Sequence, residues 1–443
     1  MVTYPGALVW PLAALAVLAV VGLALLARRM RLVSLPRLLA AAVSAVVPLA
    51  ASAVLAQGLW ELLVGWRPAY DGMGGLLHRP QGFEAAVAAL SVLALLGWYL
   101  LLRRRLGPAA LAIGALAWPA GLGVLCAQVA PGVSYVVALP ALLCALGGLA
   151  ALLLPGPAWG RVAAATLGTV LAAALLPALA RNAFDGMGLA LGGASALVLA
   201  LFGLTALPIV ELCLPEPGRR AAVAVPLTAA GLAVALVGFG LAVDRFDAGH
   251  PRRTHLAYVL DADTGTARWV SADAEPGEWT RRYVSGHDVA ALPAGYARGT
   301  LWTGAAPAIR TDGPRVSVLA RGGGTIRLRV SAGRGARSVT LRVDRPIIEA
   351  TASTGGTGPV TLPVTGTRVN TWPAEIRFRG IPARGAQITL RVPGADRIRL
   401  TAIGETDGLG AVPGFVPRPP GLVAATREDG DLVAVTRTYL FEL

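Results

Sequence analysis

The most telling absence in this 443-residue chain is lysine, because all of its 39 basic residues are arginine. Without lysine, the chain cannot supply the lysine of a P-loop, of a Schiff-base enzyme or of a protein kinase. The abundance of alanine, glycine, proline and arginine is typical of a GC-rich bacterial genome. The formal net charge of +14 is therefore weak support for nucleic-acid binding, and we predict no nucleic-acid partner.

Cysteine and histidine are also scarce. The three cysteines all lie in long apolar segments, so the C-terminal half has neither a disulfide framework nor a cysteine-based zinc motif. A catalytic zinc needs three protein ligands, and the scattered histidines do not form a His-Glu-x-x-His helix. The sequence therefore offers no catalytic, cofactor-binding or metal-ligating set. The residues concerned are Cys126, Cys144, Cys213, His78, His250, His255 and His287.

Two local patterns imitate functional sites. The run Asp261–Gly265 has the Asp-x-Asp-x-Gly spacing of a calcium loop, but Ala272 stands where the bidentate glutamate would fall. A hairpin turn between two strands is the favoured interpretation. Ser285, His287 and Asp288 are the residue types of a catalytic triad, but neighbours in sequence rarely meet the geometry of a triad. We predict no catalysis from them.

The first 244 residues contain eight apolar segments, each close to the 20 or so residues that cross a bilayer. Prolines within most of them predict kinked helices, because neighbouring helices can satisfy the freed carbonyl groups. The expected spans are Ala7–Ala27, Leu38–Trp60, Ala85–Leu102, Ala109–Val129, Tyr135–Leu154, Val162–Ala180, Leu189–Val210 and Ala221–Val243. The prolines include Pro11, Pro48, Pro119, Pro140, Pro177 and Pro226.

The links between these spans are asymmetric in arginine, and positive residues favour the cytoplasmic side. Ten arginines stand in the odd-numbered links (28, 29, 31, 37, 103, 104, 105, 161, 219 and 220) and three in the even-numbered ones (67, 79 and 181). This predicts a multi-pass plasma-membrane protein with both termini outside. The first span has its arginines after it, the reverse of a signal peptide. Such a helix can insert unaided, and the same order is also expected if an exported domain with its own signal anchor preceded Met1.

Ionisable residues of the membrane half stand at the ends of the spans rather than in their middle. Glu61, Glu84, Glu211 and Asp244 are therefore interpreted as interfacial groups. Because a transporter places polar groups near mid-membrane, transport is the weaker hypothesis. The pair Gly188–Gly192 has the small-xxx-small spacing that lets two helices approach closely, a spacing that so much glycine makes common by chance.

From Thr254 onward, apolar and polar residues alternate, as in Ile326–Val330 and Val339–Val343. Such strands, divided by glycine, proline and aspartate turns, predict an all-β antiparallel sandwich of eight to ten strands. We therefore expect an eight-helix transmembrane domain over residues 1–244 and an extracytoplasmic β sandwich over 245–443. The strand arginines are expected on solvent faces, an interpretation favoured over a nucleic-acid or anionic-lipid surface.

Four tryptophans of the C-terminal half, Trp269, Trp279, Trp302 and Trp372, could form a platform for sugars or peptides. Large aromatic side chains more often anchor a core or a domain contact. We therefore predict that these four residues are packing anchors.

Several short elements within Pro251–Val284 carry a resemblance to a known family. They are the Pro-Arg entry, Leu256–Tyr258, Asp261–Gly265, Ala267–Trp269 and Glu278–Thr280. Together they are similar to the start of the C-terminal exported domain of membrane-bound zinc aminopeptidases, a family that includes vacuolar membrane protease and the endoplasmic-reticulum metallopeptidase. The similarity extends more weakly over the membrane half.

The resemblance implies a signal anchor, an exported di-zinc peptidase domain, eight helices and a C-terminal β domain. This chain corresponds to the last two parts, and it has no counterpart of the family's zinc ligands or catalytic glutamate. It implies a membrane-anchoring, accessory and non-catalytic portion, with zinc only in an upstream or separate peptidase domain. The alternative is an unrelated membrane-anchored protein that binds a cell-envelope ligand through its β domain.

Overall fold

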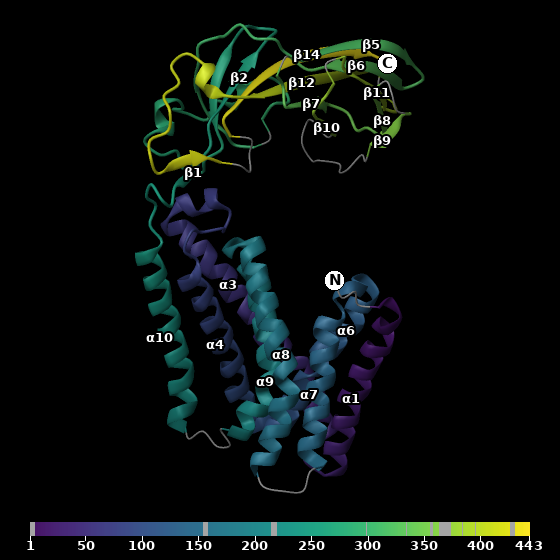
Figure 1. Cartoon of the computed structure of the whole chain (residues 1–443), viewed down its shortest axis with the longest axis vertical. Helices are drawn as coiled ribbons and strands as arrows, with labels where there is room; N and C mark the ends of the chain where they lie inside the picture. The colour runs from purple at the N-terminus through teal and green to yellow at the C-terminus, as the bar shows by residue number, and fades with distance from the viewer. Residues whose placement is uncertain are drawn as a thin grey trace. The chain divides into compact units, whose positions relative to one another are not determined.

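The computed structural model describes residues 5–153, 158–213, 219–297, 299–333, 335–354, 358–362, 374–382, 384–394, 396–425 and 430–443. The chain divides into two compact units, Met1–Arg245 and Phe246–Leu443, which we call the membrane unit and the β unit (Figure 1). Each unit has hydrophobic clusters of its own.

The described part of the membrane unit is almost entirely helical (Figure 1). Eight of its helical stretches are long and apolar enough to cross a membrane, and they overlap the eight apolar segments of the sequence. The α-helices are α1 (Val9–Arg29), α2 (Leu35–Ser44), α3 (Val46–Trp66), α4 (Gln81–Leu106), α5 (Pro108–Ala115), α6 (Ala117–Val129), α7 (Tyr135–Leu153), α8 (Ala158–Met187), α9 (Gly192–Cys213) and α10 (Arg219–Val243).

Two of the eight stretches are broken, and proline explains both breaks. The helix α2 ends at Ser44, four residues before Pro48, and α5 ends at Ala115, four residues before Pro119. A proline has no N–H for the carbonyl group four residues earlier, and its ring collides with that carbonyl. By contrast, α7 is assigned as one helix through Pro140.

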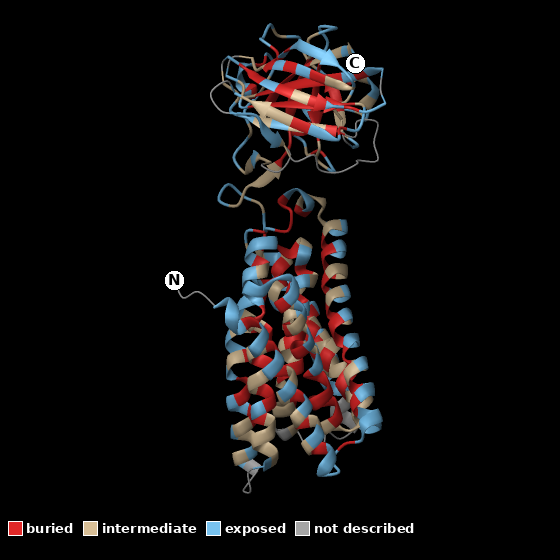
Figure 2. Cartoon of the chain, turned by 90° about the vertical axis from the view of Figure 1, so that its right-hand side faces the viewer, coloured by how far each residue is buried: buried red, intermediate tan, exposed pale blue. Residues whose placement is uncertain are grey.

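Many exposed as well as buried positions of these helices carry apolar side chains. Figure 2 shows how the exposed and buried positions are distributed along the helices. Leu62, Leu101 and Val234 are each more than 70% exposed. Soluble proteins do not surround themselves with large apolar side chains in this way, whereas a lipid environment requires it. The buried cluster, in turn, is rich in alanine.

Glycine allows close backbone contact at several places in the membrane unit, including the contact of α7 with α8 and the one at Gly188. A Cβ on Gly168 of α8 would lie 2.6 Å from the Leu143 carbonyl oxygen of α7, so these helices touch through their backbones. Gly188 has a positive φ of 68° and packs against the backbone of Gly75. The contact at Gly188 is therefore between two links, and Gly192 has only ordinary side-chain neighbours.

The described β unit contains fourteen strands, more than the eight to ten expected, because several are only three or four residues long. They are β1 (Arg252–Thr254), β2 (Ala257–Asp261), β3 (Ala267–Ser271), β4 (Trp302–Ala305), β5 (Arg315–Gly322), β6 (Thr325–Ser331), β7 (Ser338–Val343), β8 (Glu349–Ser353), β9 (Val360–Leu362), β10 (Ala374–Arg379), β11 (Ala386–Arg391), β12 (Arg397–Asp407), β13 (Leu422–Ala424) and β14 (Leu432–Glu442).

These strands form three sheets. A seven-stranded sheet has the order β10-β7-β12-β14-β2-β3-β4, a five-stranded sheet has the order β5-β6-β11-β8-β9, and β1 pairs with β13. The expectation of purely antiparallel pairing is wrong at two places, since β2–β14 and β1–β13 are parallel. Each of these pairs is joined by well over a hundred residues, which is ample for a parallel connection.

The five-stranded and seven-stranded sheets share one hydrophobic cluster. The alternating apolar residues Ile326–Val330 of β6 and Val339–Val343 of β7 are buried in it, as their pattern predicts. We call the opposite side of each sheet its outer face. Part of the outer face of the seven-stranded sheet is covered by residues 288–297 and 299–301, which we call the cap segment, with Leu292 packed against Val259 and Ile403.

Candidate ligand pocket in the β unit

The candidate site motifs of the sequence lie apart from one another or serve the fold. The His287 ring contacts the Trp302 ring with centroids 3.8 Å apart and planes tilted by 42°, and its Nδ1 donates to the Leu301 carbonyl oxygen at 3.3 Å. The backbone N–H of Asp288 donates a hydrogen bond to the Thr303 hydroxyl oxygen. Among the described residues no hydrogen bond joins Ser285, His287 and Asp288, so the structure does not assemble a triad from them.

The run Asp261–Gly265 is the turn between β2 and β3. The Asp261 carboxylate accepts the N–H of Asp263 at 2.9 Å, and Gly265 has a φ of 71° that favours glycine. The hairpin interpretation is therefore confirmed. In the described part of the chain, no three His, Cys, Asp or Glu residues cluster to form a metal site.

The acidic residues at the helix ends of the membrane unit differ in their contacts. Glu211 accepts from Arg103 at 2.7 Å and from the Tyr99 hydroxyl, which ties α9 to α4. Asp244 accepts the backbone N–H of Arg79 at 3.0 Å and is 3% exposed. These carboxylates fasten helices and links to one another.

The tryptophans form packing contacts. Trp269 and Trp279 are each 4% exposed within an aromatic cluster, and Trp279 donates its indole N–H to the Val416 carbonyl oxygen at 3.1 Å. Trp302 is half-buried, and Trp372 lies outside the described residues. For Trp269 and Trp279 the predicted role as packing anchors is confirmed.

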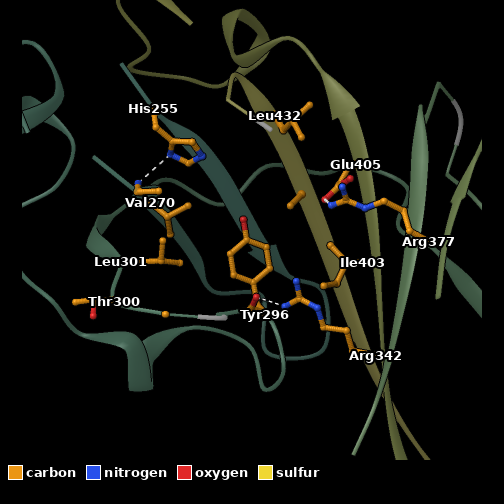
Figure 3. A pocket seen from close by; sticks show the side chains of 13 residues that line it. His255, Val270, Tyr296, Thr300, Leu301, Arg342, Arg377, Ile403, Glu405 and Leu432 are labelled. Carbon is orange, nitrogen blue, oxygen red and sulfur yellow. Dashed lines mark hydrogen bonds and ion pairs between the residues drawn. The ribbon is translucent and has the colours of Figure 1, made fainter. Parts of the chain in front are cut away.

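The strongest candidate for a binding site is a cavity of about 480 Å³ between the outer face of the seven-stranded sheet and the cap segment (Figure 3). Its size falls in the range of small-molecule sites. Strands β3, β7, β10, β12 and β14 line the sheet side. The lining residues are His255, Val270, Ala272, Tyr296, Gly299, Thr300, Leu301, Arg342, Arg377, Ile403, Glu405, Leu432 and Ala434.

Two arginine–glutamate pairs stand along one side of the cavity. Arg342 of β7 donates from Nε to Glu375 of β10 at 2.9 Å, and Arg377 of β10 donates to Glu405 of β12 at 3.4 Å. Glu405 also accepts from the Ser338 hydroxyl. The strand register puts these side chains on the same face, because Glu375 pairs with Arg342 and Glu405 pairs with Ser338.

Arg342 also holds the cap segment in place. Its Nη1 donates to the carbonyl oxygens of Gly295 and Tyr296, and Thr401 of β12 donates to the Ala294 carbonyl oxygen at 2.7 Å. The Tyr296 ring points into the cavity (Figure 3). Arg342 is only 8% exposed, so the expectation that strand arginines occupy solvent faces is wrong for this residue.

His255 lies at the other end of the cavity and is 6% exposed (Figure 3). Its Nδ1 accepts the N–H of Ala272 at 3.0 Å, so the neutral ring carries its proton on Nε2. The backbone N–H of His255 donates to Asp273 at 2.8 Å. Burial raises the pKa of Asp273 above its usual 3.8, against the lowering effect of that hydrogen bond.

This arrangement suits recognition of a small polar molecule. Guanidinium, imidazole, phenol and carboxylate groups meet over an apolar patch that includes Ile403 and Leu432. The alternating pattern places Arg342 on a strand, but the sequence does not show that Glu375 and Glu405 lie beside it. The sequence therefore did not single out this cavity.

The chain matches no family model, no curated protein and no solved structure.

Proposed function

We propose that the chain is a multi-pass plasma-membrane protein whose eight helical stretches all span the bilayer and whose β unit is an extracytoplasmic sandwich that binds a partner. The main observation behind this proposal is that one chain combines eight apolar helical stretches of membrane-spanning length with a compact β unit. The ten-to-three distribution of link arginines supports outward termini. The shared cluster between two sheets supports the sandwich.

Within this architecture we propose an accessory role for a zinc aminopeptidase domain, which the β unit would cover or orient on the outer side. The support is the resemblance within Pro251–Val284. In the structure this run contains β1, β2, β3 and the tryptophan-bearing turn that packs into the aromatic cluster. The zinc and the catalytic groups would belong to the peptidase domain, and the present chain would contribute anchorage and packing surface.

The decisive experiment is purification of the chromosomally tagged protein from its own membranes. We expect the C-terminal tag to be cleaved by protease added to intact spheroplasts. We expect the purified particle to contain a peptidase domain, stoichiometric zinc and aminopeptidase activity. A particle that holds only this 45.3 kDa chain without zinc would refute the accessory role while leaving the topology standing.

The cavity favours a second candidate function, binding of a small polar cell-envelope ligand by the β unit. Its test is a thermal-shift screen of the full chain in detergent against amino acids, dipeptides and sugar phosphates. A ligand that raises the melting temperature of the wild type should have no effect on Ile403→Trp, which fills the cavity. An equal shift in both proteins would place the ligand elsewhere.

A further inference from the structure

The outer face of the five-stranded sheet carries a diagonal line of arginines across three strands. Arg327 and Arg329 are two residues apart on β6 and therefore point to the same side. Arg315 of β5 lies opposite Ser331, and Arg391 of β11 lies opposite Thr325, which puts both on that side. We call Arg315, Arg327, Arg329 and Arg391 the arginine stripe.

The arginine stripe is exposed and poorly neutralised. All four residues are exposed. By strand register, the one carboxylate on the described part of this face is Glu349, which lies 3.8 Å from Arg391. Within the described residues, Arg315, Arg327 and Arg329 make no ion pair, whereas Arg342 and Arg377 on the other sheet each pair with a glutamate.

The rest of this face is mostly polar, apart from Ala320 opposite Arg327 and Leu319, which is exposed at the irregularity of β5. It presents side chains such as Ser317, Thr325, Gln387 and Thr389, with no aromatic residue at the described outward positions of these strands. Such a surface has few apolar groups to insert between acyl chains and no aromatic ring at these positions to stack on bases, so attraction to it is mainly electrostatic. Guanidinium groups bind phosphate through paired hydrogen bonds and are weakly hydrated, which suits contact with phosphate headgroups.

We propose that the arginine stripe docks onto anionic phospholipid headgroups of the membrane that holds the chain. Charge complementarity supports this partner, and so does the tether. Only eight residues, Asp244–Pro251, join the end of α10 to β1, so the β unit is kept at high effective concentration near the bilayer surface. The proposal rests on the membrane anchorage given under the proposed function.

The test uses the full chain in nanodiscs of phosphatidylcholine with or without 30% phosphatidylglycerol. A donor dye on a C-terminal tag and an acceptor on a trace of labelled lipid headgroup report the approach of the β unit. We expect energy transfer to rise with phosphatidylglycerol and to fall back in 0.5 M NaCl, where the screening length is roughly 4 Å.

The informative variant is R315Q/R327Q/R329Q, which removes three unpaired charges. Each arginine near an anionic surface contributes roughly a fivefold factor, so the docked-to-undocked ratio should fall on the order of a hundredfold. The matched control R281Q/R337Q/R397Q removes three exposed arginines that are each ion-paired, with Glu275, Asp407 and Glu442. The control should keep the response of the wild type.

The outcomes separate cleanly. An equal loss in both variants would show that net charge alone acts, and an unchanged response in R315Q/R327Q/R329Q would show that the arginine stripe is not the docking surface. Either result overturns the proposal. Preferential capture of a short RNA over phosphatidylglycerol nanodiscs would also overturn it, in favour of a nucleic-acid surface. Failure of the chain to enter nanodiscs would instead refute the membrane anchorage.

Discussion

The two large sheets of the β unit carry arginine at alternating positions, yet their outer faces differ in kind. On the seven-stranded sheet, Arg342 and Arg377 are matched by glutamates from neighbouring strands, and Arg342 also bonds the cap segment. On the five-stranded sheet, Arg327 and Arg329 face outward without a carboxylate beside them. The same local pattern therefore produces a structural network on one sheet and an open basic surface on the other.

The difference is set by residues distant in sequence. Glu375 and Glu405 come to the seven-stranded face from β10 and β12, on either side of β7. On the five-stranded sheet the residues opposite Arg327 and Arg329 are serine, alanine, threonine and glutamine. A charge buried with its partner is costly to disturb, whereas an exposed charge contributes little to stability.

The largest predicted effect is that of Arg342→Leu. The substitution removes the ion pair between Arg342 and Glu375 and the hydrogen bonds from Arg342 to the carbonyl oxygens of Gly295 and Tyr296. We expect the free energy of unfolding of the β unit to fall by about 3 kcal/mol, because the remaining groups stay largely buried. Pulse proteolysis of the full chain in detergent, over a urea series, measures this loss.

The matched control for that measurement is Arg329→Leu on the other sheet. Because Arg329 is exposed and has no ion pair among the described residues, we expect a change within about 0.5 kcal/mol. Equal losses for the two variants would abolish the distinction between the faces. A loss below about 1 kcal/mol for Arg342→Leu would also abolish the distinction, since breaking a buried ion-pair network should lower the free energy of unfolding by more than this.

Sequence reasoning reaches the membrane unit more completely than the β unit. A span of about 20 apolar residues is a local property, so the helices could be located from runs such as Ala7–Ala27. The helix breaks before Pro48 and Pro119 are also local, because proline removes one donor at a fixed offset. The contact between Gly75 and Gly188 joins distant links, and no spacing rule predicts it.

In the β unit, alternation identifies strands such as β6 and β7 but not their neighbours. It gives the inward direction of Leu328 and Leu341 correctly. It also suggests a solvent face for Arg342, and this is wrong because the cap segment, folded back from 40 to 50 residues earlier in the chain, covers it. The cavity depends on that long-range contact, so it emerges only in three dimensions.

A smaller effect is expected from Thr401→Val, which removes the hydrogen bond from β12 to the Ala294 carbonyl oxygen. Thr401 is fully buried, so the loss should be about 1 kcal/mol, with faster amide hydrogen exchange in residues 289–297. The control Thr361→Val changes an exposed threonine of β9 and should leave both quantities unchanged. Unchanged exchange in Thr401→Val would mean that this hydrogen bond does not hold the cap segment in place.

The smallest predicted effect comes from a substitution that gives the outer face of the five-stranded sheet a carboxylate, as on the outer face of the seven-stranded sheet. Thr389 of β11 lies directly opposite Arg327 of β6, so Thr389→Glu places a carboxylate where the other sheet has one. A cross-strand pair of opposite charges should add about 0.5 kcal/mol to the free energy of unfolding, and this gain should shrink in high salt. The uncharged variant Thr389→Gln should show no gain. Its ability to dock onto phosphatidylglycerol should also match the wild type, while Thr389→Glu docks less. If Thr389→Glu stabilised the sheet without weakening docking, Arg327 would pair with the new glutamate but would not contribute to lipid binding. The lipid contact would then have to depend on Arg315 and Arg329.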